Sequence, residues 1–512
     1  MVGPQAGETR RCPGEKYDIA LAICHARQAH DYAKCLLCPH RTGGAPDETA
    51  SDPKVKSRIF RTTSVAGRVP SELNEYVMRK VGSAAAQCLR AESNEVSTMV
   101  VASDARENSR GLLRAFCEGV NAGGMHTVTI GPTMPEVLRF ALVARKMGSA
   151  AFISGCHAAE DVNGVRIFRR GGAPVTFADG LDKMGLIARR VRAGRSRTPG
   201  QNKTLNPLLD YRTHVLKAAP QFESMKVVVD ASGGMAGEVL WQVFARLPVA
   251  LVRSNCEPDG HSSLLGERFP AASVQAVLAE AVRSQGARLG MAVDYDGDMC
   301  AFWDETGAAV RSDVVAALVA AEALARAPGA RVAYDLRFTG AVREDILHAG
   351  GQPMRCAGDP LLLAQLACRN EVAYAADMMG RHFYSDLFGA ESPVLTLLHL
   401  CSLLSRRGEP LSRIAAEVSR YSYSGELRYD FPAAEQAEQA AESVGAEFSE
   451  ADHDTLDGLT CRFSDWWFNL RQTPGAPSLK LVVEGRSRNE ERHGRQALER
   501  IIREHQGKAA AT

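Results

Sequence analysis

The sequence lacks most of the features that mark a membrane, secreted or nucleic-acid-binding protein. Its formal net charge is +1 over 512 residues, so no basic surface field indicates a nucleic acid or an anionic membrane as partner. No apolar run reaches the ~18 residues that a membrane span needs. The first residues, MVGPQAGETRRCPGEKYD, have no apolar core of a signal peptide. We therefore expect a cytoplasmic protein without nucleic-acid or membrane partners.

The sequence has no pattern of paired cysteines. Its 13 cysteines are scattered and odd in number, which argues against a disulfide framework. Residues 1–56 are rich in Cys and His, and Cys35 and Cys38 have the two-residue gap of a zinc knuckle. Four cysteines of this extension are candidate ligands of one Zn²⁺: Cys12, Cys24, Cys35 and Cys38. The alternative is a tail with reduced thiols. If it binds zinc, the extension is a candidate docking module for a protein partner.

After the extension, strand-like and helix-like segments alternate. Short β-branched runs predict buried strands at 98–103, 127–131, 150–154, 226–232, 289–294 and 331–336. Apolar residues at helical spacing predict helices at 71–89, 272–285 and 311–326, the first of them capped by Ser71. Such alternation predicts stacked α/β layers.

Polar or Pro/Gly-rich seams divide the chain further. They separate three α/β units, at 57–200, 201–307 and 308–423, from a last segment at 424–506. That segment has a strand-like run at 478–485 followed by a charged helix. The predicted fold class is α/β, with three consecutive mixed-sheet domains, a smaller C-terminal α+β domain and the Cys/His-rich extension.

The most specific chemical signal is VDYDGDMC, which carries three alternate aspartates directly after a predicted strand. Asp294, Asp296 and Asp298 can converge on a hard divalent cation, because Gly297 lets the backbone turn tightly. Mg²⁺ takes few protein oxygens and leaves positions for phosphate oxygens. A solvated Asp/Gly turn is the alternative. The spacing does not match an EF-hand loop.

This loop resembles the DGDGDR metal loop of the α-D-phosphohexomutases, and four further segments resemble that family's motifs in the right order. They are VASDARENS (101–109), SGCHAAEDVNGVRIF (154–168), AADMMGRHFY (375–384) and FNLRQTPGAPSLKLVVEG (468–485). CEPDGH (256–261) resembles the stretch shortly before the metal loop. The resemblance covers residues 58 to 505 and implies four domains around a central cleft. It also implies Mg²⁺ and a hexose phosphate that exchanges its phosphoryl group with a phosphoserine.

Several positions depart from the family pattern. Cys156 stands at the phosphoserine position, where it is either an inert small residue or a thiol nucleophile. His157 is kept, and it either acts on a proton, lowers the Cys156 pKa or is simply hydrogen-bonded. The losses are Met299 and Ala66 for two arginines, Ala158 and Ala159 for Asn-Pro, Asp359 for a His, and Met379 for a Ser.

Other positions keep the character that the resemblance implies for ligand binding. Arg166 and Arg337 stand for lysines of the family, and Asp377 and Arg381 lie in the sugar-recognition loop. The phosphate-binding loop retains Arg471 and Thr473, with Gly475 in place of a Thr. An ordinary turn before an edge strand is the alternative for that loop.

Three functions remain open from the sequence. The first is a phosphoglucomutase/phosphomannomutase-like protein that binds hexose phosphate and Mg²⁺ with weak or lost mutase turnover, since losing one transition-state donor costs roughly 10²–10³ in rate. The second is an active mutase or sugar phosphatase with phosphocysteine at Cys156. The third is a non-catalytic scaffold whose zinc-binding extension recruits a partner.

Overall fold

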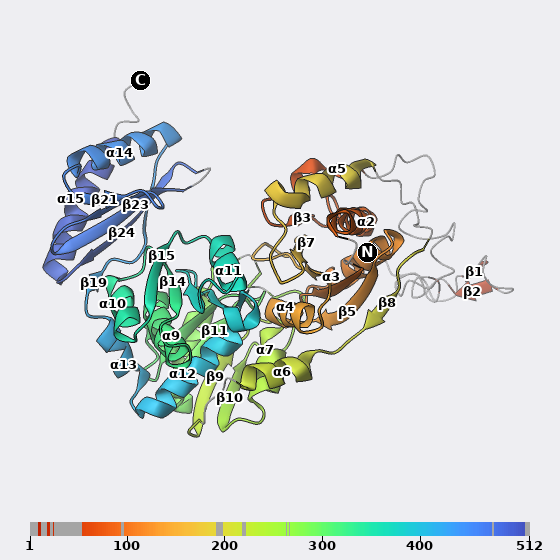
Figure 1. Cartoon of the computed structure of the whole chain (residues 1–512), viewed down its shortest axis with the longest axis horizontal. Helices are drawn as coiled ribbons and strands as arrows, with labels where there is room; N and C mark the ends of the chain where they lie inside the picture. Colours follow the sequence, from red (N-terminus) through yellow and green to blue (C-terminus); the bar gives the residue numbers. More distant parts are fainter. Residues whose placement is uncertain are drawn as a thin grey trace. The chain divides into compact units, whose positions relative to one another are not determined.

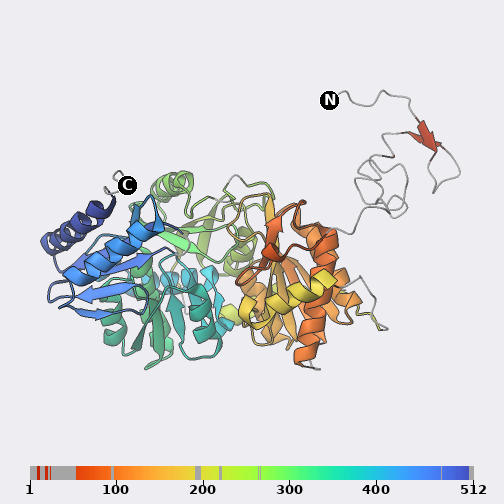
Figure 2. The ribbon, with the colours of Figure 1, turned by 90° about the horizontal axis from the view of Figure 1, so that it is seen from above.

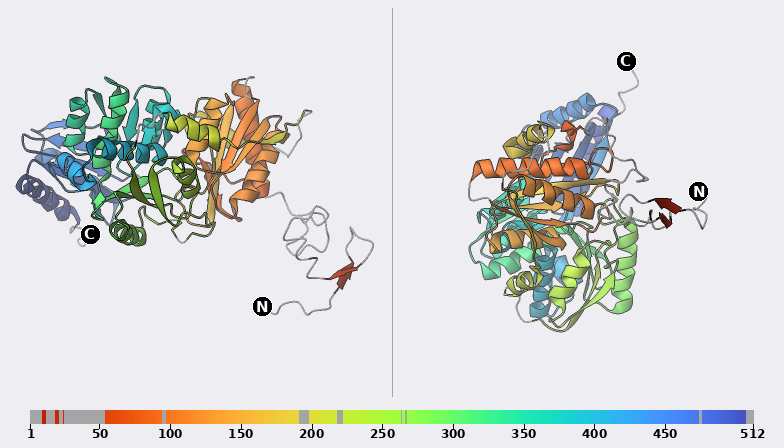
Figure 3. Two further views of the ribbon diagram at one scale, coloured as in Figure 1. Left: turned by 90° about the horizontal axis from the view of Figure 1, so that it is seen from below. Right: turned by 90° about the vertical axis from the view of Figure 1, so that its right-hand side faces the viewer.

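The computed structural model describes residues 9–11, 18–20, 24, 54–93, 97–190, 198–217, 222–262, 264–265, 267–473 and 476–506. The chain divides into two compact units, Met1–Lys54 and Val55–Thr512. In the smaller unit, β1 (Thr9–Arg11) and β2 (Asp18–Ala20) pair antiparallel, drawn as dark red arrows in Figure 3. Cys24 is buried. The other three candidate zinc ligands lie outside the described residues, so the zinc site stays a prediction.

The first sheet of the larger unit has six strands in the order β3-β7-β6-β4-β5-β8 (Figure 1). It is mixed, because β7 runs antiparallel to its neighbours β3 and β6, while β6, β4, β5 and β8 run parallel to one another. The strands are β3 (Val65–Arg68), β4 (Thr98–Ser103), β5 (His126–Pro132), β6 (Ser149–Ile153), β7 (Val162–Arg169) and β8 (Asn202–Thr204). The helices are α2 (Glu75–Glu92), α3 (Ser109–Ala122), α4 (Pro135–Ala144) and α5 (Asp182–Arg190). The sequence predicts that the first α/β unit ends at residue 200, but the last strand of its sheet, β8, follows that boundary.

Both faces of this sheet are covered, which explains why the four central residues of β4, 99–102, are all apolar. Met99 and Val101 pack in one core with α2 and α3, whereas Val100 and Ala102 pack in a second core with α4. The predicted helix at 71–89 begins later, at Glu75, and the expectation of a cap at Ser71 is wrong. The N–H groups of residues 72 and 73 bond to the carbonyl of Arg68 in a turn. Asn74 caps the helix instead, with its side chain accepting from the Val77 N–H at 3.0 Å.

The second and third sheets have five strands each, in the orders β10-β9-β11-β12-β13 and β15-β14-β16-β17-β18. In each, three parallel strands continue into an antiparallel edge. The second comprises β9 (Met225–Asp230), β10 (Val249–Ser254), β11 (Leu289–Val293), β12 (Cys300–Asp304) and β13 (Ala309–Val310), with α6 (Leu208–Leu216), α7 (Ala236–Phe244) and α8 (Ala272–Gln285). The third comprises β14 (Arg331–Asp335), β15 (Gln352–Cys356), β16 (Tyr374–Ala376), β17 (His382–Tyr384) and β18 (Ala390–Glu391), with α9 (Ser312–Arg326), α10 (Gly340–His348), α11 (Pro360–Cys368), α12 (Pro393–Arg407) and α13 (Leu411–Val418).

The last sheet is antiparallel in the order β19-β24-β23-β22-β21, with β20 also paired to β24. Helices α14 and α15 pack together against it (blue in Figure 2). Its strands are β19 (Ser422–Tyr423), β20 (Leu427–Asp430), β21 (Asp452–Asp454), β22 (Leu459–Arg462), β23 (Trp466–Gln472) and β24 (Ser478–Gly485), and its helices are α14 (Ala434–Glu447) and α15 (Arg488–Gln506). The predicted fold class is confirmed for the larger unit, whose four sheets are mixed or antiparallel.

One hydrophobic core runs through the second and third sheets and includes Val137 and Phe140 of helix α4, together with Met134 just before it. Helix α4 therefore packs on the first sheet with one side and contacts β18 of the third sheet with another. This packing brings loops from three sheets together. Among the described residues, no helix combines the length and the apolar character needed to cross a bilayer.

Candidate functional site

The aspartate loop is a tight connection between the antiparallel strands β11 and β12. Asp294 organises it, because its carboxylate accepts the backbone N–H groups of Asp296, Asp298 and Met299 at 2.7–3.1 Å. Gly297 has φ +78°, a left-handed conformation that glycine adopts without strain. All three aspartates are buried, with 3% of each residue exposed. The loop therefore directs buried carboxylates toward the end of the sheet, as the sequence predicts.

The loop that carries Cys156 is fixed by Arg106, the buried arginine of the segment at 101–109. Its guanidinium donates to the carbonyls of Cys156, Ala158, Ala159 and Val162 at 2.7–2.9 Å and lies 3.2 Å from Asp104. Gly155 is needed here, because a Cβ would lie 2.4 Å from this guanidinium. Cys156 itself has φ +51°, a costly conformation for a residue other than glycine. Arg106 thus positions the residue that replaces the phosphoserine.

The two loops meet at His157. Its Nδ1 lies 3.4 Å from Asp294 Oδ2 and 3.8 Å from Asp296 Oδ2, and its Nε2 lies 3.5 Å from Asp298 Oδ1. Ser154 also links the loops, because its hydroxyl donates to Asp296 Oδ1 at 2.5 Å. We call Cys156, His157, Asp294, Asp296 and Asp298 the aspartate cluster. The structure brings together the candidate catalytic and metal-binding residues that the sequence indicates.

The charges of this cluster set the protonation of its members. Burial raises the pKa of the Cys156 thiol to about 11, and Asp296 and Asp298 add to that effect against Arg166. Burial alone would lower the pKa of His157, but the surrounding aspartates, Asp298 foremost, raise it to about 9. Near pH 7 the residue beside the carboxylates is therefore a neutral thiol next to an imidazolium. Neither group is in the form that nucleophilic attack on phosphorus needs.

The residues present fit a divalent cation. Asp296 Oδ2 and Asp298 Oδ1 are buried and have no hydrogen-bond partner in the described part of the chain. His157, Asp294 and Asp296 each present a ligand atom within 4.8 Å of the others. The contact of 3.1 Å between Arg381 Nη2 and His157 Nε2 needs a neutral imidazole, because a guanidinium only donates. A cation on the carboxylates would favour that neutral ring. The donor set, mostly hard carboxylate oxygen, suits Mg²⁺.

Three candidate ligand-binding residues adjoin the aspartate cluster. Arg166, on β7, lies 3.3 Å from Asp298 through Nη1. Arg381 lies 3.2 Å from Asp377. Asp377 also accepts the N–H groups of Met379 and Arg381 at 2.9 and 3.0 Å, so its carboxylate holds its own loop together. Asp377 thus shapes the loop that presents Arg381, which itself contacts His157.

The remaining candidates belong to a second group around Glu426, just before β20. Glu426 binds Arg337, Arg471 and Lys480 at 2.7–2.8 Å, and Arg337 and Arg471 reach further carboxylates on Asp335 and Asp457. We call Arg337, Glu426, Arg471 and Lys480 the Glu426 cluster. The Thr473 hydroxyl is buried without a hydrogen-bond partner in the described part of the chain, and Gly475 lies outside the described residues.

Sequence reasoning missed Glu426, Arg139 and the bracing role of Arg106. Glu426 has no distinguishing pattern around it. Arg139 had a signal, because it interrupts the apolar stretch PEVLRFALVA, and a charged residue on the buried face of a helix is rarely there without a partner or a function. Arg106 lies in the segment 101–109, for which the sequence indicates only a resemblance to a family motif.

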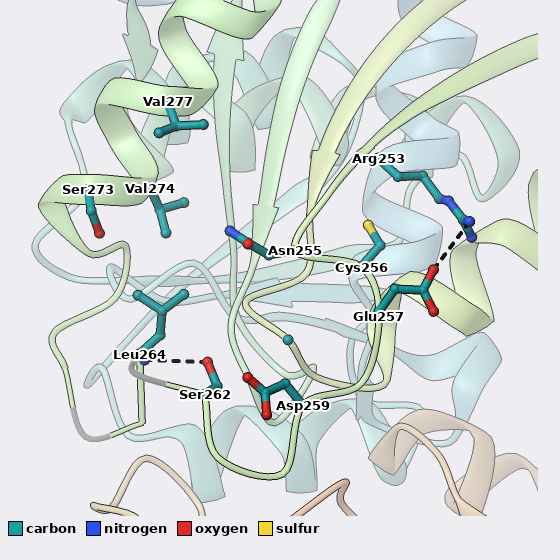
Figure 4. A pocket seen from close by; sticks show the side chains of 11 residues that line it. Arg253, Asn255, Cys256, Glu257, Asp259, Ser262, Leu264, Ser273, Val274 and Val277 are labelled. Atoms are coloured by element: carbon teal, nitrogen blue, oxygen red, sulfur yellow. Dashed lines mark hydrogen bonds and ion pairs between the residues drawn. The ribbon is translucent and has the colours of Figure 1, made fainter.

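A larger hollow, of about 660 Å³, lies away from these clusters at the carboxyl ends of β9 and β10 and beside α8 (Figure 4). Arg253 and Glu257 on its wall pair with each other at 3.3 Å, and Ser262 accepts the Leu264 N–H. The Asn255 side chain donates to Asp230. These polar groups are bound to the chain itself, so the hollow offers little unmet hydrogen-bonding capacity.

Comparisons with known proteins agree with this architecture. Two models of the phosphoglucomutase/phosphomannomutase family match, alpha/beta/alpha domain I at residues 57–181 and domain II at residues 209–307. Phosphohexose mutases of Xanthomonas campestris are 28% identical over 439 residues, which is 83% of this chain and 95% of that protein. A phosphomannomutase of Vibrio cholerae is 25% identical over 440 residues, 83% of this chain and 94% of that protein.

The fold is matched by a solved structure as well. A phosphoglucomutase/phosphomannomutase family protein of Burkholderia thailandensis superimposes with a TM-score of 0.77 at 25% identity, covering 90% of this chain and 99% of that chain. The shared architecture, the matched family models and the buried aspartate loop lead to one conclusion. The chain belongs to the α-D-phosphohexomutase superfamily.

Proposed function

We propose that this protein binds a hexose phosphate together with a divalent cation and turns the sugar over weakly or not at all. The observation that carries the proposal is the contrast within the aspartate cluster. Asp296 and Asp298 each keep an oxygen without a hydrogen-bond partner in the described part of the chain, whereas the phosphoryl-accepting position holds the thiol of Cys156, whose pKa is about 11. The carboxylates can therefore bind a cation, whereas the thiol at the acceptor position is protonated and cannot attack phosphorus.

Asp294, Asp296 and Asp298 would hold the cation. When bound, it would neutralise phosphate charge beside Cys156. Arg166 and Arg381 flank the same space and donate only, so they orient an oxyanion without accepting a proton from it. Without the cation, the pKa of His157 is about 9, so the ring is protonated near pH 7 and offers no base to Cys156. With the cation bound, the neutral ring accepts from Arg381 through Nε2. These residues bind and orient phosphate but do not activate a nucleophile.

Calorimetry tests the binding half of the proposal. We expect the protein to bind Mg²⁺ and, in its presence, glucose 1-phosphate. Asp296→Asn should weaken Mg²⁺ at least about 100-fold, because even residues that only support a ligand are worth up to that factor. Asp386→Asn, at an exposed carboxylate, should leave Mg²⁺ binding unchanged. Absence of both Mg²⁺ and sugar phosphate binding would remove the proposal.

A coupled assay tests the turnover half. It uses glucose 1-phosphate and mannose 1-phosphate with a hexose bisphosphate activator, on wild type, Cys156→Ala and Cys156→Ser. We expect wild type and Cys156→Ala to give the same background rate. Cys156→Ser should remain near that rate, since Met299 and Ala66 still replace two cationic positions of the family. Turnover that disappears in Cys156→Ala would instead establish the phosphocysteine enzyme.

A further inference from the structure

A cavity of about 230 Å³ opens beside Cys156 and His157, on the side where helix α4 meets the third sheet. Three arginines line it, Arg139 from α4, Arg166 from β7 and Arg381 from the loop before β17. Asp298 and Glu391 are the carboxylates on its wall, and Thr63 and Ser64 add two hydroxyls. Three arginines therefore face two carboxylates in this cavity. Such a lining favours an anion.

Arg139 is the most unusual member of the lining. Only 2% of it is exposed, yet its Nη2 donates to one carbonyl, that of Phe388, at 2.7 Å, and its Nη1 lies 3.7 Å from Glu391. Its Nε is buried without a hydrogen-bond partner in the described part of the chain. Burying a guanidinium is costly unless hydrogen bonds and opposite charge compensate. The Phe168 ring, with its centroid 5.6 Å from the guanidinium carbon, adds a cation–π contact. These contacts still leave the Nε–H without an acceptor among the described residues.

Arg166 is in a similar state. Its Nη1 lies near Asp298, whereas its Nε and Nη2 are buried and, among the described residues, have no partner. Glu391 and Asp298 are therefore the carboxylates near two arginines that both retain donors without a partner in the described part of the chain. The two side chains thus present three nitrogen donors, Nε of Arg139 and Nε and Nη2 of Arg166, that have no partner among the described residues. These donors can bind an oxyanion.

We propose that this cavity holds a carboxylate of the sugar, so that the preferred ligand is a phosphate of an acidic sugar, such as a hexuronic acid 1-phosphate. The inference rests on the proposed function, because the phosphate of the same molecule is assigned to the cation and its neighbours. A planar carboxylate matches the forked geometry of a guanidinium. The loop before β17 supports the choice, because it brings Arg381 to the wall of the same cavity.

The test compares two probes that differ only at carbon 6, α-D-glucuronic acid 1-phosphate and α-D-glucose 1-phosphate. Calorimetry with Mg²⁺ present should give wild type about tenfold or more in favour of the glucuronic acid, the value of one charge-assisted hydrogen bond. Arg139→Met should reduce that preference to about twofold and leave glucose 1-phosphate binding unchanged. Arg145→Met, at the C-cap of the same helix but half-exposed and paired with Asp210, should keep the full preference.

Each other outcome has a defined meaning. Equal affinity of wild type for both probes overturns the proposal, as does a loss in Arg139→Met that is the same for both, which would assign the cavity to phosphate. If Arg139→Met does not fold, Glu391→Gln decides, since removing the competing carboxylate should tighten only the glucuronic acid phosphate, by about threefold. No change there overturns the proposal. Failure of wild type to bind either probe counts against the proposed function instead.

Discussion

The aspartate cluster and the Glu426 cluster differ in how completely the chain satisfies their charges. In the first, Asp296 and Asp298 each keep a buried oxygen, and the neighbouring Arg166 keeps two nitrogens, that have no hydrogen-bond partner among the described residues. In the second, each of the three cations is bonded to Glu426 at 2.7–2.8 Å. Because a buried polar atom without a hydrogen bond is costly, a ligand should stabilise the first arrangement more than the second.

This difference separates two kinds of binding site. A ligand at the aspartate cluster gains the full value of groups that are already desolvated. An anion at the Glu426 cluster must first compete with a carboxylate that already occupies the arginine donors. The main binding energy should therefore come from the aspartate cluster and the arginines next to it. The Glu426 cluster should contribute only when Glu426 is displaced or neutralised.

The largest expected effect comes from breaking the support of the first region. Arg106→Met removes the guanidinium that holds four carbonyls and Asp104, which leaves those buried groups unpaired. We expect the free energy of unfolding to fall by about 3–5 kcal/mol, the cost of removing one partner of a buried pair. Urea titration of the full chain measures it. Arg68→Met, at an exposed arginine with a 3.8 Å ion pair, should cost under about 1 kcal/mol. Equal losses in both variants would contradict the bracing role.

A smaller effect is expected on the stability of the fold at low pH, through the carboxylate of Glu426. Burial alone would raise the pKa of Glu426, but hydrogen bonds and charges of Lys480, Arg337 and Arg471 lower it to about 2. A lowered carboxyl pKa contributes stability that is complete above the ordinary value, 4.5, and is lost as the pH falls toward 2. After a discount for its 22% exposed side chain, this contribution is about 2 kcal/mol.

Wild type should therefore be more stable than Glu426→Gln at pH 7, and the gap should narrow steadily below about pH 4.5. Thermal midpoints of both proteins between pH 7 and 3 measure the gap. A gap that stays constant across this range would show that the Glu426 charge is not what stabilises the cluster.

The sequence predicted more of the first region than of the second. Local pattern was enough for the strands and for the aspartate loop, because a β-branched run and three alternate aspartates are contiguous signals. Glu426 had no such signal, since its partners Arg337, Arg471 and Lys480 come from separate segments and only the folded chain assembles them. Arg139 was missed for a related reason. The side of helix α4 on which it lies becomes buried only where α4 meets the third sheet. The cap at Asn74 was missed because the turn from Arg68, which keeps Ser71 outside the helix, is not visible in helical periodicity.

The smallest expected effect comes from removing the carboxylate that neutralises the cations of the Glu426 cluster. In Glu426→Gln, Arg337, Arg471 and Lys480 lose the carboxylate that neutralises them, so inorganic phosphate should bind about tenfold more tightly than to wild type. Glu438→Gln, an exposed change on α14, controls for net charge and should have little effect. Adding Arg471→Met to Glu426→Gln should remove the gain, which assigns it to this cluster and not to the arginines beside Cys156. Wild-type affinity in Glu426→Gln would mean that Asp335 and Asp457 alone keep these arginines occupied, and that the second cluster is a structural ion-pair network.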